Sequence, residues 1–156
     1  KMKILISACV YGKSVRWNGD NRYDSEIKQW ALDNNFELIP VCPENELFGT
    51  PRTPIRLRAV GGEIKAFAGK TEVYSLLKNK SKDIYGRFED VVGFIGIARS
   101  PTCGISAGVK DLGSTIKAPM HQVFDCPTTE INSMRTKRNR QKFLERIKKY
   151  ESRRPC

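Results

Sequence analysis

The sequence predicts an α/β fold built on a parallel sheet, and three observations support this prediction. Short apolar runs alternate along the chain with stretches of helical periodicity. The run VVGFIGIA at residues 91–98 is continuously apolar, which is typical of a strand covered on both faces. The length of 156 residues, with 39% hydrophobic and 29% charged residues, fits one globular domain with a core of its own.

Four apolar runs are the expected strands, and helical patterns separate them. The strands are Lys3–Ala8, Phe36–Val41, Val91–Ala98 and His121–Asp125. The helical patterns cover residues 24–34, 71–84 and 106–112 and the basic segment that follows Thr128. This alternation favours right-handed crossovers between parallel strands. Residues 43–62 differ, because three prolines and three glycines prevent any single regular element from spanning them.

The net charge of +11 is concentrated near the end of the chain. Residues Arg135–Arg154 contain ten basic and two acidic residues, a net charge of +8. Such a segment suits an anionic partner such as RNA, although solvated basic faces are also common on terminal helices. Its apolar positions recur at helical spacing. We therefore expect residues 1–128 to form the α/β catalytic domain and residues 129–156 a basic helical tail docked on it.

The sequence also limits the compartment and the kinds of metal site. No apolar run approaches the roughly 20 residues of a membrane span, and we interpret the apolar start as a buried strand of a cytoplasmic protein. The five cysteines are dispersed and form no CxxC pair, which gives no support to a zinc ribbon or a thioredoxin-type site. With His121 as the single histidine, a histidine-based metal site is not expected.

Three cysteines follow three of the expected strands. Cys9 and Cys42 come directly after the first two strands, and Cys103 lies five residues past the third. Ligands of a parallel sheet bind beyond the carboxyl ends of its strands, so these thiols are expected to converge. The alternative is that they are separate buried cysteines, which are common near strands.

A converging set of thiols narrows the choice of metal. Soft sulfur ligands select zinc, copper(I) or iron–sulfur clusters. Structural zinc sites usually draw on local CxxC pairs, whereas clusters accept dispersed cysteines and often have a Cys-Pro ligand such as Cys42-Pro43. The spacing alone predicts a thiol-rich site for which an iron–sulfur cluster is one candidate.

Four ordered motifs resemble those of the DUF523 family, whose characterised members are thiouracil and thiouridine desulfidases. The motifs are SACVYG with VRWNG at residues 7–12 and 15–19, PVCPE at 40–44, TPRTP at 50–54 and SPTCG at 100–104. The resemblance covers most of residues 3–118. Val10-Tyr11 and Trp17-Asn18 depart from the pairs that family members often have.

The resemblance implies a single Rossmann-like domain with its catalytic site at the C-terminal ends of the strands. It implies a [4Fe-4S] cluster held by Cys9, Cys42 and Cys103, in an oxygen-sensitive enzyme. The iron without a protein ligand would take the sulfur of a thiolated pyrimidine, 2-thiouracil or 4-thiouridine monophosphate. Water would replace that sulfur, giving the oxo-pyrimidine and sulfide.

Two residues near the cysteines are expected to take part in catalysis. Attack by water needs a base, and Glu44, two residues past Cys42, is placed for this role. Ser100, three residues before Cys103, is placed to hydrogen-bond the substrate or relay a proton. A solvated loop glutamate and a common Ser-Pro turn are the ordinary alternatives.

A nucleotide substrate would also need a phosphate site. Arg16 and Arg52 lie in the motif loops, and guanidinium groups suit a phosphate. Backbone amides from Gly104 to Ala107, at the start of an expected helix, could serve in the same way. Surface salt bridges are the alternative for the arginines.

Two other readings of the function stay open at this point. One is an RNA-binding or RNA-sensing module with a structural metal site, and the other is desulfuration of thiolated tRNA. The favoured partner is a small thiolated base or nucleotide, with no membrane contact and an open oligomeric state. Cys126 is expected to be a buried thiol outside the ligand set, and Cys156 to be disordered.

Overall fold

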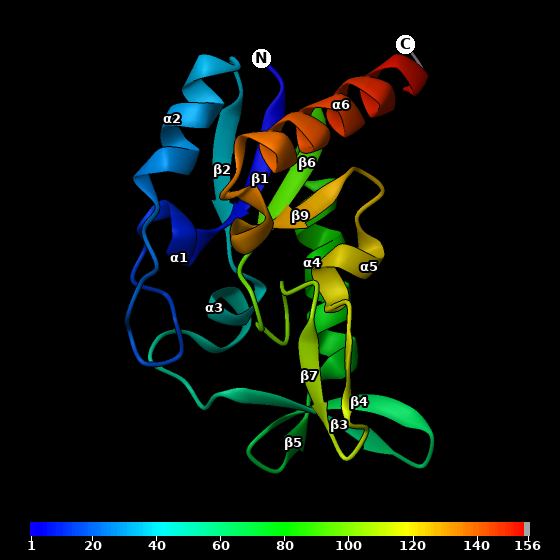
Figure 1. Cartoon of the computed structure of the whole chain (residues 1–156). Coiled ribbons are helices and arrows are strands. Elements are labelled where there is room, and N and C mark those ends of the chain that lie inside the picture. The colour runs from blue at the N-terminus through cyan, green and yellow to red at the C-terminus, as the bar shows by residue number, and fades with distance from the viewer. Residues whose placement is uncertain (155–156) are drawn as a thin grey trace.

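The computed structural model describes residues 1–154 and contains two sheets (Figure 1). Sheet A has four parallel strands in the order β2-β1-β6-β9. Their bounds are β1 Lys3–Ser7, β2 Glu37–Val41, β6 Val91–Gly96 and β9 Thr128–Glu130. The prediction of an α/β fold with a parallel sheet is therefore confirmed.

Helices cover both faces of sheet A, as the continuous apolar run in β6 predicts. On one face, Ile4 and Ile6 of β1 pack with α2 (Ser25–Asp33) and α6 (Lys137–Arg153). On the other face, Leu5 and Phe94 pack with α4 (Tyr74–Gly86) and α5 (Pro119–Val123). Successive residues of a strand point to opposite faces, so the alternation along β1 supplies both halves of the core.

The fourth strand differs from the prediction. The segment His121–Asp125 is not a strand, because Pro119 opens the helix α5, in which Met120 and His121 are buried. The strand follows this helix as β9, in which Thr128 pairs with Phe94 of β6. A short apolar run without clear periodicity can be a strand or a buried helix, and here it is the helix.

A second sheet, sheet B, contains segments that the sequence pattern did not identify as strands. Its order is β5-β4-β3-β7-β8. The bounds are β3 Ile55–Val60, β4 Glu63–Ala68, β5 Thr71–Glu72, β7 Ala107–Lys110 and β8 Ser114–Ile116. The expected helix over residues 106–112 is wrong, because residues 107–110 alternate between buried and exposed, the period of a strand.

The segment over residues 43–62 consists of two elements rather than one loop. Residues Pro43–Phe48 form α3, and β3 pairs with β4 across the turn Gly61-Gly62. Both glycines have positive φ, which a two-residue hairpin turn of this type requires. The prediction that no single element spans this segment is correct.

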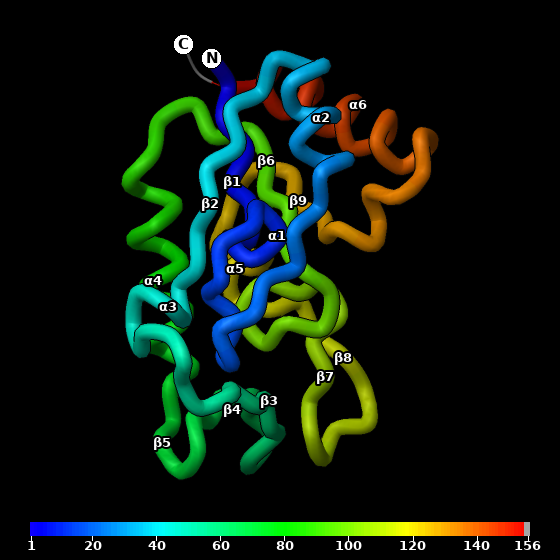
Figure 2. The backbone as a smooth tube through the Cα atoms, turned by 90° about the vertical axis from the view of Figure 1, so that its left-hand side faces the viewer, coloured from blue at the N-terminus to red at the C-terminus, as the bar shows by residue number. Residues whose placement is uncertain are grey.

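Sheet B lies beyond the carboxyl ends of the sheet A strands (Figures 1 and 2). Helix α4 connects the two sheets, since its Leu77 packs with the inner face of sheet B and its Ile84 with sheet A. The space between the two sheets is where the motif loops gather.

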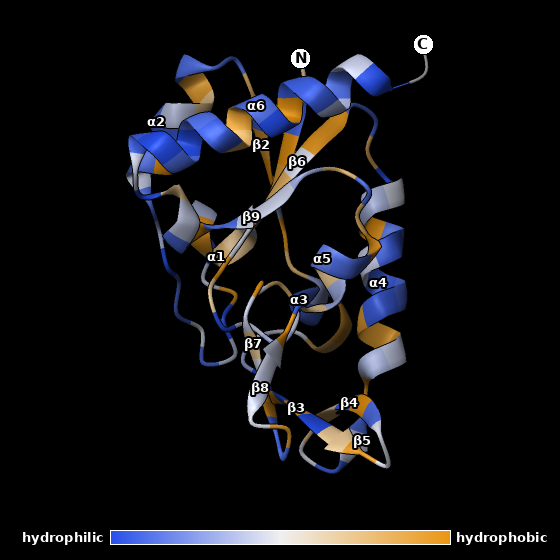
Figure 3. Cartoon of the chain, turned by 45° about the vertical axis from the view of Figure 1, so that its right-hand side comes forward, coloured by the Kyte–Doolittle hydropathy of each residue, from blue (hydrophilic) through white to orange (hydrophobic). Residues whose placement is uncertain are grey.

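The basic helix α6 lies across one face of sheet A. Thr136 caps it, its side chain accepting a hydrogen bond from the Asn139 amide at 3.1 Å. Phe143 and Ile147 are buried against the sheet, while most of the helix surface is hydrophilic (Figure 3). Within residues 1–154, no helix is both long and apolar enough to span a bilayer.

Candidate active site

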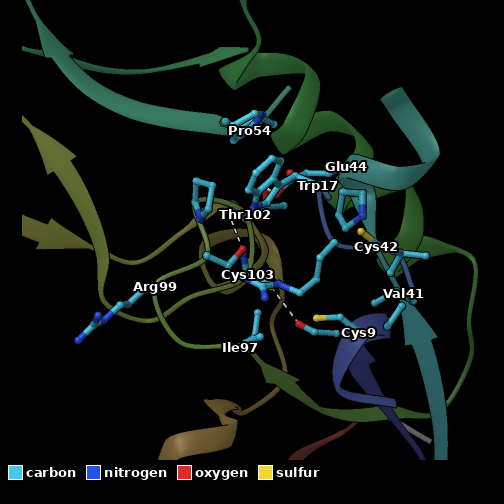
Figure 4. A pocket seen from close by; sticks show the side chains of 18 of the residues that line it. Cys9, Trp17, Val41, Cys42, Glu44, Pro54, Ile97, Arg99, Thr102 and Cys103 are labelled. Atoms are coloured by element: carbon cyan, nitrogen blue, oxygen red, sulfur yellow. Dashed lines mark hydrogen bonds between the residues drawn. The ribbon is translucent and has the colours of Figure 1, made fainter. Parts of the chain in front are cut away.

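A cavity of about 280 Å³ opens between the ends of β1, β2 and β6 and the start of β3 (Figure 4). All three cysteines of the expected ligand set line it, together with Glu44 and Ser100. Arg16 and Arg52 line it as well. Its further polar and aromatic lining residues include Trp17, Arg99 and Thr102. The convergence expected from the strand ends is therefore present in the structure.

Cys9 and Cys42 are held by short helices that follow strands. Cys9 belongs to α1 (Ala8–Tyr11), and Cys42 is the N-cap of α3, where its Sγ accepts a hydrogen bond from the Asn45 amide at 3.4 Å. Burial, followed by the nearby thiols of Cys103 and Cys42, raises the pKa of Cys9 to about 12. Burial also raises the pKa of Cys42 to about 11, against the lowering effect of the Asn45 amide.

Cys103 is buried in the loop between β6 and β7. Its Sγ accepts a hydrogen bond from Ser7 Oγ at 2.9 Å. The turn before it is fixed by Ser100 Oγ, which accepts hydrogen bonds from the amides of Thr102 at 3.2 Å and Cys103 at 3.1 Å. Burial raises the pKa of the Cys103 thiol, although the hydrogen bonds from Ser100 and Ser7 act in the opposite direction.

The main chain of Cys103 packs directly on β6. A Cβ atom placed on Gly96 would lie 1.9 Å from the Cys103 carbonyl oxygen, so only glycine fits there. His121 Nε2 donates a hydrogen bond to the same carbonyl at 2.7 Å, and its buried Nδ1 has no partner within the described residues. Burial lowers the pKa of His121 to about 4, so the neutral ring acts as a donor that positions this loop.

The three thiols form a donor set that a cationic centre would stabilise. Their burial and their proximity both disfavour ionisation, and a metal centre that binds thiolates offsets this cost. Among residues 1–154, no three Cys, His, Asp or Glu side chains could together hold one metal ion. A cluster distributes its cysteine ligands over several irons, and three thiols that line one cavity suit that arrangement.

Glu44 is a buried carboxylate with two side-chain partners. Its Oε1 accepts a hydrogen bond from Arg52 Nε at 3.2 Å, and its Oε2 accepts one from Thr102 Oγ1 at 2.7 Å. The side chains of Glu44 and Arg52 are only 11% and 6% exposed. A carboxylate held in this way faces the cavity in one orientation.

Arg52 is engaged in the cavity wall through an ion pair, the alternative to phosphate binding that the sequence left open. Besides Glu44, it donates hydrogen bonds to the Gly49 carbonyl and to Thr50 Oγ1, both at 3.0 Å. Its Nη2 lies 4.0 Å from Cys42 Sγ. The geometry makes Arg52 a positioning residue for Glu44.

The expected phosphate site at Gly104 is corrected by the structure. No helix begins there, since Ala107 is the first residue of β7. The amide of Gly104 donates to the Ser100 carbonyl at 3.0 Å, and that of Ile105 donates to Glu130 Oε2 at 3.0 Å. These amides are therefore not available to a phosphate, and Gly104 is not among the residues that line the cavity.

Arg16 and Arg99 are the cavity arginines without an ion pair among the described residues. Arg99 has a positive φ of 64°, and its side chain points away from the cysteines in Figure 4. The sequence reasoning missed Arg99, Thr102 and Trp17 as cavity residues. All three lie inside or directly beside the motifs, so their position in the sequence could have identified them as candidates.

Of the two remaining cysteines, the structure describes Cys126, which does not line the cavity. Cys126 is buried in the core with Phe94 and Phe124, and burial raises its pKa to about 12. Cys156 lies outside the described residues.

Comparisons with known proteins agree with the resemblance in the motifs. Residues 4–124 match the family model of 2-thiouracil desulfurase. A solved structure, the [4Fe-4S]-dependent thiouracil desulfidase TudS (DUF523Vcz), is similar with a TM-score of 0.65 and 19% identity. The match covers 86% of this chain and 93% of that one, and a comparison with curated proteins gives no match. The chain belongs to the 2-thiouracil desulfurase family.

Proposed function

We propose that the protein is a [4Fe-4S]-dependent desulfidase that acts on a small thiolated pyrimidine. The observation on which this depends is the single cavity shared by three cysteine thiols and a buried, partnered carboxylate. Membership of the 2-thiouracil desulfurase family and the fold shared with TudS support the proposal.

Cys9, Cys42 and Cys103 are the residues that would hold the cluster. Three protein ligands leave one iron of a [4Fe-4S] cluster open, and an open metal position is typical of catalytic rather than structural sites. When bound, the cluster supplies a Lewis acid and an acceptor for the thiocarbonyl sulfur.

Side chains of the protein would deprotonate the attacking water. Glu44 takes a proton from water, while Arg52 and Thr102 hold its two oxygens in place. The carbon–sulfur bond breaks, the water oxygen becomes the new carbonyl oxygen, and sulfur leaves as hydrogen sulfide. Carbon and sulfur keep their oxidation states, so this hydrolysis needs no external oxidant or reductant.

Ser100 has two roles in this proposal. Its oxygen accepts two backbone amides and so shapes the turn that holds Cys103. Its hydroxyl also lines the cavity, where it is placed to hydrogen-bond the substrate. The first role depends only on the folded chain, and the second depends on the bound pyrimidine.

The size of the cavity favours a free base or mononucleotide. About 280 Å³ lies at the lower end of the range of small-molecule sites. We therefore propose 2-thiouracil or 4-thiouridine monophosphate as substrates, with Arg16 as the candidate phosphate ligand.

The test is an anaerobic preparation analysed for iron, sulfide and absorption, followed by turnover of both thiolated substrates. We expect a brown protein with close to four irons per chain, as the cluster formula requires, and stoichiometric release of uracil or its nucleotide with sulfide. A preparation with a full cluster that converts neither substrate would overturn the proposed function.

A further inference from the structure

Trp17 is a large aromatic residue exposed at the mouth of the cavity. Its residue exposure is 45%, whereas the other tryptophan, Trp30, is 8% exposed and packs against Phe36 and Phe143. Burial of an aromatic ring is strongly favourable, so an indole left open at a cavity needs an explanation. Trp30 is part of the hydrophobic core, whereas Trp17 belongs to none of the core clusters among the described residues.

The main chain of Trp17 is fixed to the segment that holds the proposed base. Its carbonyl accepts a hydrogen bond from the Arg52 amide at 2.9 Å, and the Arg52 side chain binds Glu44. The turn around it is closed by the Gly19 amide, which donates to the Arg16 carbonyl at 2.8 Å. The main chain of Trp17 is thus linked to Glu44 through one intervening residue, Arg52.

The walls around Trp17 suit a flat ring. The cavity is lined by apolar side chains at Val15, Pro43, Pro54 and Ile55, in addition to the cysteines. Figure 4 places the Trp17 side chain in the region of Glu44 and Pro54. Among the polar groups of the lining, Glu44 is already bound by Arg52 and Thr102. A planar, weakly polar ring is the kind of ligand that such walls accept.

We propose that Trp17 stacks on the pyrimidine ring of the substrate and holds it over the cysteines and Glu44, an inference that rests on the proposed function. Every nucleobase presents a π face, and stacking on an aromatic side chain changes binding by roughly 5- to 150-fold per base. Because the contact is made to the ring, it is present in substrate and product alike. Its loss therefore weakens binding and raises KM, with a smaller effect on kcat.

The experiment measures uracil and uridine monophosphate binding to the cluster-loaded protein by calorimetry, next to thiouracil kinetics. Trp17→Ala is expected to weaken uracil binding and raise KM by roughly 5- to 150-fold, and Trp17→Phe to retain most of the affinity. Tyr23→Ala is the matched control, because Tyr23 is 54% exposed on the same loop but does not line the cavity. Its binding should equal that of the parent protein.

The outcomes separate this inference from the proposed function. Parental uracil affinity in Trp17→Ala, in a protein that desulfurises thiouracil, overturns the stacking and leaves the function intact. Loss of iron or of thermal stability in Trp17→Ala also overturns it, because the indole would then support the wall. Uracil binding that depends on Trp17 in a parent protein without turnover supports the stacking and refutes the desulfidase activity.

Discussion

The cavity and the outer face of α6 both contain many charged side chains, but the two regions use them differently. In the cavity, Glu44 and Arg52 form a pair whose side chains are 11% and 6% exposed. On α6, the pair between Arg140 and Glu26 has side chains 22% and 74% exposed. Exposed ion pairs contribute little to folding stability, whereas a buried charge that loses its partner is strongly destabilising. The same residue types therefore define a fixed chemical site only where the backbone buries them.

The largest expected effect concerns the three cavity cysteines. Replacing Cys9, Cys42 or Cys103 by serine should abolish cluster binding and activity, since each supplies one thiolate. Cys126→Ser is the matched control, because Cys126 is a buried thiol that does not line the cavity. Iron and sulfide per chain are the measurements. Loss of the cluster in Cys126→Ser, with retention in any of the other three, would contradict the assignment.

A second large effect is expected at Gly96. Gly96→Ala places a methyl group 1.9 Å from the Cys103 carbonyl oxygen and 2.9 Å from His121 Nε2, so the Cys103 loop must move. Overpacking of this kind costs about 1–3 kcal/mol or more. Gly108→Ala on sheet B is the control, since a Cβ there meets no atom within 4 Å.

The two glycine variants are compared by thermal unfolding and by iron content. We expect Gly96→Ala to lose both stability and most of its iron, and Gly108→Ala to keep both. Full iron content in a stable Gly96→Ala protein would show that the Cys103 loop is not fixed by β6.

The next effect concerns chemistry at an intact site. Glu44→Gln should keep the cluster and lose about 10²- to 10⁴-fold in turnover, because the amide cannot take a proton from water. Glu46→Gln is the control, since Glu46 lies two residues further along α3 and pairs with Arg87 outside the cavity. Parental turnover in Glu44→Gln, at equal iron content, would refute the assignment of the base.

The sequence was sufficient for the parts of the molecule that depend on local pattern. The runs that became β1, β2 and β6 are apolar and bounded, and parallel strands bring their carboxyl ends together. This is why the placement of Cys9, Cys42 and Cys103 at one edge could be predicted before any coordinates. Resemblance then supplied the candidate cofactor, which spacing alone left open.

The remaining features depend on contacts that no local pattern reports. Sheet B was missed because β3 lies in the Pro- and Gly-rich stretch 43–62, and because β7 contains Gly108 and resembles a short helix in composition. The pairing of Arg52 with Glu44 depends on the return of the loop after α3, so the sequence left a phosphate ligand and an ion pair open for Arg52. The hydrogen bond from His121 to the Cys103 carbonyl also required the tertiary structure.

The smallest expected effect concerns the basic face of α6, whose contribution to activity can be tested against that of the cavity. Arg138, Lys142, Lys148 and Lys149 are exposed and form no ion pair among the described residues. Arg140 is left unchanged, because it donates to the Met134 carbonyl at 2.6 Å and so supports the structure. Neutral glutamines at the four positions retain the helix propensity of the native side chains.

These four substitutions should change thiouracil turnover by no more than a few-fold. Phe143 and Ile147 dock α6 on the face of sheet A, whereas the cavity opens at the carboxyl ends of the strands. Exposed charges act over a Debye length of about 8 Å at physiological ionic strength, so the face of α6 contributes little to an uncharged substrate. The measurement compares turnover of thiouracil and of thiolated tRNA, before and after substitution, at fixed salt. Efficient tRNA turnover that collapses when the charges are removed would make RNA the substrate, because only a polyanion needs both the cavity and the basic face.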